Sequence, residues 1–189
     1  MSPILGLIDS AKTGNLTSPS MDFIATYEVP SGGVSQISFS SISQNYTHLH
    51  IRGVLRNEHP SYQYGSLYWQ HNGTGQGQYH NATWAADPPS LNYGGAGGAG
   101  TPFGTVPTSN ITSGFFSQWV LDMFEYKNTN KNKTVIYRDG FAASSYQVVD
   151  MGSASFANNL NATTSINFYS LTSNFIQYSR LSLYGIRGE

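Results

Sequence analysis

The sequence contains no cysteine among its 189 residues, so disulfide bonds and thiolate metal sites are excluded. Charged residues are also scarce. They make up 10% of the chain, whereas an average soluble protein has about 25%. The formal net charge of -1 provides no long-range field that would attract nucleic acid or an anionic membrane. We therefore expect neither of these partners.

Long apolar runs are missing as well. No stretch approaches the roughly 20 apolar residues that a membrane-spanning helix needs. The first apolar run, from Ile4 to Ile8, is too short for the core of a secretion signal and has no basic segment before it. These features predict a protein that is made in a cytoplasm and is not secreted.

Uncharged polar and aromatic residues take the place of charge. The chain has 20 Gly, 13 Tyr and 10 Phe. Short segments of alternating apolar and polar residues, such as VSQISFSSI and THLHIRGVLRN, recur between turn residues, and this period of two is typical of half-buried strands. About nine such segments predict an all-β fold, an antiparallel two-sheet sandwich of jelly-roll type. The predicted core consists of Phe39, Leu49, Ile51, Trp119, Leu121, Val135, Ile166, Phe168, Leu181 and Leu183.

The distribution of Gly, Pro and aromatic residues along the chain predicts its domain organisation. Residues 1–20 are expected to form an extended N-terminal arm, because Gly and Pro residues interrupt regular strand pairing there. Residues 21–189 form the sandwich domain. Within it, the segment from about 62 to 107 is rich in aromatic residues, Gly and Pro, which predicts a long inserted loop. The segment EYKNTNKNKT, residues 125–134, predicts a solvated hairpin tip.

The stretch YTHLHIRGVLRN places two histidines on one face of a predicted strand. His48 and His50 point the same way because side chains two residues apart share a face. Such a pair can bind a metal ion, but no third ligand stands in a recognisable motif. Arg52 and Arg56 continue the same face, and two guanidinium groups would repel a divalent cation. We therefore expect no metal site, and we interpret this face as a polar wall that contacts a neighbouring subunit.

Sequence motifs for catalysis are not found. Asp122 and Glu125 lie three residues apart on a predicted strand, so they face opposite sides and cannot act as paired carboxylates. The chain has no nucleophile motif and no phosphate-binding loop, and GGAGGAG does not join a strand to a helix. We expect neither enzymatic activity nor a cofactor.

Four stretches of the chain share the pattern of one protein family: ILGLI near the start, YTHLHIRG, VLDMFEYKNTNKNKTV, and NFIQYSRLSLYGIRG at the end. They resemble a family of small structural proteins of tailed bacteriophages, whose members typically read ILG-I-A, YTHLQIR, IDI-DY-NTNKYKT and NFxQYSxFALYGIKG. The resemblance spans nearly the whole chain and implies a β-sandwich virion component without catalytic residues. The chain departs from the family at His50, where Gln is frequent, and in the segment from 62 to 107.

The first functional hypothesis is a capsid decoration (cement) protein located in the virion. Apolar side chains of the arm would bind the major capsid protein or tail proteins of the same virion; they are Ile4, Leu5, Leu7 and Ile8. The protein would self-associate as a homotrimer, which suits the threefold positions of an icosahedral shell. The expected subunit contacts are His48, His50, Arg52, Tyr68 and Trp69.

The alternative hypothesis is an adaptor of a tail fibre or baseplate, or a carbohydrate-binding module for receptor recognition. Aromatic rings can stack on sugar rings, and neighbouring polar groups can bind the sugar hydroxyls. The residues expected to contact a glycan are Tyr64, Trp69, Tyr79, Trp84 and Asp87. The sequence shows no shaft repeat and no coiled coil, which favours the decoration hypothesis.

Overall fold

The computed structural model describes residues 21–73, 78–84, 90–95, 101–143, 146–156, 160–171 and 173–188. These residues form twelve strands without any helix, and every strand pairing is antiparallel. Accordingly, these ranges contain no helix with the length and hydropathy of a membrane span. The predicted all-β, two-sheet antiparallel fold is confirmed.

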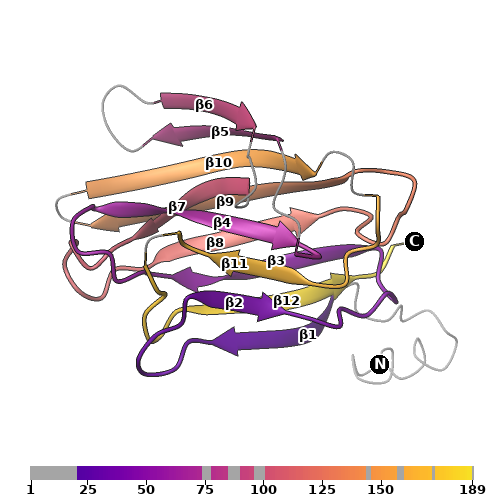
Figure 1. The fold of residues 1–189 in the computed structure, drawn as a ribbon, viewed down its shortest axis with the longest axis horizontal. Helices are drawn as coiled ribbons and strands as arrows, with labels where there is room; N and C mark the ends of the chain where they lie inside the picture. The colour runs from indigo at the N-terminus through magenta and orange to yellow at the C-terminus, as the bar shows by residue number, and fades with distance from the viewer. Residues whose placement is uncertain are drawn as a thin grey trace, which may run out of the picture.

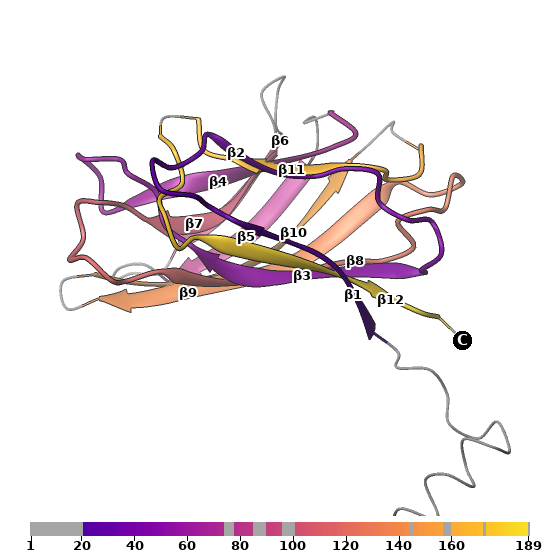
Figure 2. The same ribbon diagram turned by 90° about the horizontal axis from the view of Figure 1, so that it is seen from below.

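The strands form two sheets that lie face to face (Figures 1 and 2). The large sheet has the order β1-β12-β3-β8-β9-β10-β5-β6, and the small sheet has the order β2-β11-β4-β7. In sheet order, the large sheet comprises Met21–Glu28, Arg180–Ile186, His48–Leu55, Ser117–Met123, Lys133–Ala143, Tyr146–Phe156, Gln78–Trp84 and Ser90–Gly95. The small sheet comprises Gln36–Phe39, Ile166–Tyr169, Tyr64–His71 and Thr101–Pro107.

Most connections carry the chain from one sheet to the other. The strands β1, β3, β8 and β12 belong to the large sheet, and their sequence neighbours β2, β4, β7 and β11 belong to the small sheet. Two hairpins, β5–β6 and β9–β10, stay within the large sheet. They add four strands to the large sheet on the side of β8 (Figure 1).

The core fills the space between the sheets, and the period of two in the sequence accounts for it. Along the eleven residues of β9, for example, buried positions alternate with more accessible ones. All ten residues predicted for the core are buried, which confirms that prediction. Trp119 is among them, and its indole N–H donates to the Ser117 hydroxyl at 2.8 Å. A buried indole nitrogen is therefore satisfied within its own strand.

The segment from 62 to 107 is not one long loop, contrary to the prediction. It contains β4, β5, β6 and β7. In β4 the side chains of Leu67, Trp69 and His71 are buried, while Tyr68 and Gln70 between them are partly accessible. The aromatic residues that suggested a loop thus occupy alternating environments in a strand. Residues 74–77, 85–89 and 96–100 lie outside the described residues, as does the predicted arm, residues 1–20.

Candidate interaction surface

The polar stripe of β3 lies on the outer face of the large sheet, as its period predicted. His48, His50 and Arg52 alternate with the buried residues Leu49 and Ile51. The strand β8 lies beside β3 and places Asp122 directly opposite His50. The His50 Nδ1 and Asp122 Oδ1 atoms are 2.6 Å apart, so the pair forms a hydrogen bond across the two strands.

The two histidines have separate partners and do not converge on a common point. His48 Nδ1 accepts a hydrogen bond from the backbone N–H of Glu125 at 2.9 Å, which commits its lone pair. Its ring also packs edge-on against Phe124, with 5.2 Å between the ring centroids. In the described ranges, no group of three or more His, Asp and Glu side chains is arranged to hold a metal ion. The hydrogen bonds tie β3 to β8 and to the turn that follows β8.

The two arginines of this stretch have different environments. Arg52 is exposed, and its guanidinium lies 5.0 Å from the centroid of the Tyr184 ring on β12, a cation–π contact. Arg56 was expected on the same face, but it is 3% exposed, because β3 ends at Leu55 and the chain turns inward. Its guanidinium donates to the carbonyl oxygens of residues 111, 112 and 115 at 2.6–2.9 Å. Arg56 therefore holds a loop and does not extend the stripe.

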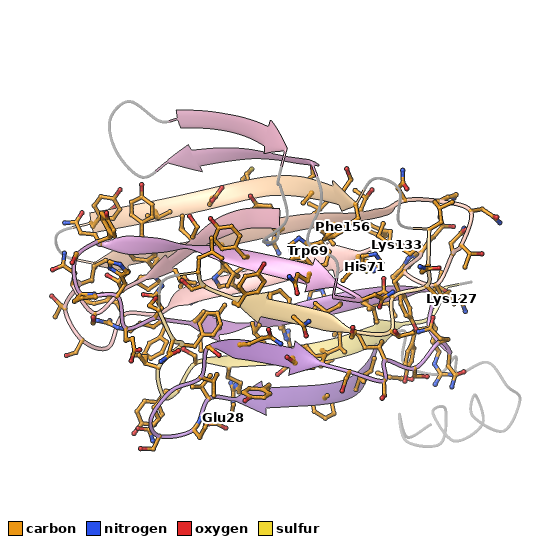
Figure 3. The ribbon with its side chains drawn as sticks, viewed as in Figure 1. Glu28, Trp69, His71, Lys127, Lys133 and Phe156 are labelled. Carbon is orange, nitrogen blue, oxygen red and sulfur yellow. The ribbon has the colours of Figure 1, made fainter. Side chains whose placement is uncertain are left out.

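The segment from 125 to 134 is only partly the solvated tip that its composition predicted. Lys133 is 1% exposed, and its ammonium donates to the carbonyl oxygens of Asn128, Lys131 and Leu160. Burial lowers the pKa of Lys133. Tyr126 is also fully buried, and its hydroxyl donates to the Ser43 carbonyl oxygen. In Figure 3, Lys133 is labelled near His71, and Lys127 lies closer to the end of the sandwich.

Three of the stretches that resemble the phage family meet at one end of the sandwich. Thr47, just before β3, donates its backbone N–H to the carbonyl oxygen of Ile186, the last residue of β12, at 2.8 Å. A Cβ at Gly185 would overlap the ring of Tyr46, so this close approach requires glycine. The strand β1 begins at the same end, because Met21 pairs with Ile186. The turn after β8 reaches this end through the bond to His48.

The aromatic residues predicted to make contacts divide into a buried residue, Trp69, and two accessible ones, Tyr68 and Tyr64. Trp69 is completely buried and packs edge-on against Phe156, at 4.5 Å between centroids (Figure 3), so it is removed from both predicted contact sets. Tyr68 lies on the outer face of the small sheet, where its ring stacks on Tyr169 at 5.8 Å. Tyr64 is 39% exposed and stacks on Tyr146 at 5.5 Å.

Other predicted contact residues have side chains outside the described part of the chain. The arm residues Ile4, Leu5, Leu7 and Ile8 lie outside the described residues, and so does Asp87. Tyr79 and Trp84 belong to β5, which is described by its backbone alone. Their assignment stays a prediction from the sequence.

A pair of buried carboxyl groups was not predicted from the sequence. Asp139 on β9 pairs directly with Asp150 on β10, and both are buried, at 6% and 0% exposure. The backbone N–H and the hydroxyl of Thr105 on β7 donate to Asp139 Oδ2 at 2.9 and 3.1 Å. Burial, and then the charge of Asp150, raise the pKa of Asp139 well above its usual range. The pair therefore retains a proton more readily than a surface acid and links β7 to the large sheet.

No family model, curated protein or solved structure matches this chain.

Proposed function

We propose that the protein is a structural component of a phage virion and, more specifically, a capsid decoration protein. The strand order is the main observation that supports this. With β1-β12-β3-β8 facing β2-β11-β4-β7, the eight strands follow the order of a jelly roll, and β5–β6 and β9–β10 are hairpins added to it. Jelly rolls occur in viral capsid proteins and in lectins. The order thus supports the same class of protein as the sequence resemblance.

The stretches that resemble the phage family lie together at one end of the sandwich. These stretches supply contacts that close this end, such as those of Thr47 with Ile186 and of His48 with Glu125. Because β1 begins there with Met21, the first 20 residues connect to the sandwich at this end. An attachment arm would therefore join the domain beside the stretches that carry the resemblance.

Attachment through the arm alone is expected to be weak. Burial of Ile4, Leu5, Leu7 and Ile8 against a partner would contribute on the order of 6–10 kcal/mol. Ordering about seven backbone residues would cost roughly 7–14 kcal/mol. Because these values nearly cancel, several arms of one oligomer are needed for stable attachment. Self-association is therefore part of the proposal.

The test is binding to particles that lack the protein, with the full chain and with a variant that lacks residues 2–20. We expect the full chain to occupy the particles and the variant to keep its β-sheet circular dichroism but lose binding. A point control in the domain, Gln36→Ala on an exposed position of β2, should bind like the full chain. Full occupancy by the truncated protein would show that the arm is not the anchor, and loss of its fold would assign the arm to the sandwich.

A carbohydrate-binding function is the second candidate, and the small sheet favours it. Its four strands contain no Asp, Glu, Lys or Arg. Its outer face presents the amides of Gln70 and Asn167 beside Tyr169, whose hydroxyl lies 3.4 Å from the Gln70 amide nitrogen. Uncharged amides beside aromatic rings suit a neutral sugar. Binding to a glycan array that is lost in Tyr169→Ala and kept in Ile136→Ala, on the other sheet, would support this candidate over decoration alone.

A further inference from the structure

The outer face of the large sheet is unusually apolar for a surface that none of the described segments covers. The outward face of an antiparallel sheet is commonly polar. Here six large hydrophobic side chains on this face are between 39% and 62% exposed: Met21, Phe23, Phe124, Ile136, Val149 and Met151. They form one group on β1 and another on β9 and β10, with Phe124 just after β8 between them. Grouped exposed hydrophobic side chains indicate an interaction site more often than scattered single residues do.

The strand register places these side chains in rows that cross the face. Phe23 lies opposite Tyr184, which lies opposite His50, and the row continues through Asp122 to Ile136. The row thus crosses β1, β12, β3, β8 and β9 without a break. A second row, two residues further along β3, contains Arg52, Val120, Arg138 and Met151. Apolar and charged side chains therefore alternate across one surface.

The size of this face matches what a stable protein contact needs. In sheet order, the face comprises the six strands β1, β12, β3, β8, β9 and β10, each at least seven residues long. Seven residues extend about 23 Å along a strand and six strands extend about 24 Å across the sheet, which gives a projected area of about 550 Å². Side chains roughen the surface, so the accessible area is larger than this projection. A standard interface buries about 800 Å² per partner. The accessible area of the face is therefore of the same order as one partner's share of a standard interface.

The charges of the face indicate which partner fits it. Asp122 has Arg52 and Arg138 as diagonal neighbours, each two residues beyond its direct partner on the adjacent strand. Among the described residues, Arg138 makes no ion pair. A face that carries the carboxylates of Asp122 and Glu28 beside the guanidinium groups of Arg52, Arg138 and Arg180 complements itself across a twofold axis, since each Asp122 can meet the other copy's Arg138. The net charge of -1 adds no long-range repulsion between copies.

We propose that two copies of this chain associate through the outer faces of their large sheets. The contact uses the stripe of His48, His50 and Arg52 together with the apolar residues around it. This pairing does not depend on a role in the virion. It also leaves the outer face of each small sheet accessible on the opposite side of its sandwich.

Sedimentation equilibrium of the full chain at micromolar concentration tests the pairing. We expect a mass of about 41 kDa, twice the 20.6 kDa of one chain. Ile136→Lys places a charge in the centre of the contact and should raise the dimer dissociation constant by at least about thirtyfold. The matched control is Ser38→Lys on the exposed side of β2, which should leave the mass unchanged. Circular dichroism of each variant shows whether its fold is kept.

A charge exchange tests the twofold geometry without a loss of packing. Asp122→Arg and Arg138→Asp should each be monomeric alone, because identical charges meet at both symmetric contacts. An equimolar mixture of the two variants should restore the 41 kDa species, because opposite charges then face each other at both. A monomeric wild type, a trimer unaffected by Ile136→Lys, or a dimer that only Ser38→Lys dissociates would each overturn the proposal. A trimer would instead support the arrangement expected from the sequence.

Discussion

The buried carboxyl pair makes a specific prediction about stability and pH. Because the folded pKa of Asp139 is raised by burial and by Asp150, the folded state holds a proton that the unfolded chain releases. Its contribution to stability is present below the unfolded pKa of about 3.9 and is lost as the pH rises toward the folded pKa. Within this window, each pH unit reduces the free energy of unfolding by about 1.4 kcal/mol through this group.

Asp139→Asn removes this titration while it keeps an oxygen that can accept the hydrogen bonds from Thr105. Its amide carries no charge, so it does not repel the carboxylate of Asp150. The variant should therefore gain stability relative to the wild type as the pH rises from 4 to 7, by about 1.4 kcal/mol for each unit inside the window.

Urea unfolding of both proteins at four pH values in this range measures the difference directly. The control is Glu28→Gln at the exposed end of β1 (Figure 3), which β12, β3 and β8 separate from β9 and which should show no such trend. Parallel pH profiles for Asp139→Asn and the wild type would refute the reasoning, because they would mean that Asp139 titrates alike in the folded and unfolded states.

Three further substitutions test the packing. Trp119→Ala should lower the free energy of unfolding by about 3–5 kcal/mol in urea titrations, because the indole is 3% exposed and stacks on Tyr137; a loss below 1 kcal/mol would contradict this. Lys133→Ala leaves three carbonyl oxygens without their donor and should cost about 2–4 kcal/mol by the same assay, more than Lys131→Ala on the surface. Gly53→Ala should reduce the thermal midpoint strongly, because its Cβ would overlap the Arg180 carbonyl oxygen where β3 pairs with β12; an unchanged midpoint would show that this pairing adjusts at little cost.

The period of two was sufficient to predict which residues of β3 face the core. His48, His50 and Arg52 were placed correctly on an outer face, and Leu49 and Ile51 on the inner one, because a strand allows only two orientations. The same rule also places Lys133 in the inward phase of β9, two residues before Val135. The prediction of a solvated tip gave the preference of lysine for water more weight than this period, and was wrong for that residue.

Other features depend on contacts between distant parts of the chain. Asp139 and Asp150 are polar residues within segments that alternate as strands do. Only the register between β9 and β10 shows that the two residues lie opposite each other. Trp69 was assigned to the surface because its neighbours are rich in Gly and aromatic residues, whereas the inward phase of β4 buries it. Arg56 follows the strand pattern in the sequence, but β3 ends one residue earlier. Strand ends and partners are set by tertiary packing, which local patterns do not encode.

The most direct test of the proposed role is an electron-microscopy map of the intact virion in which this chain is produced. The proposal predicts density on the capsid surface that fits the two sheets, with the end at Met21 and Ile186 directed toward the shell. Density of this shape at the tail would support the adaptor hypothesis instead. Particles that lack the protein altogether would contradict the proposal that it is a structural component of the virion.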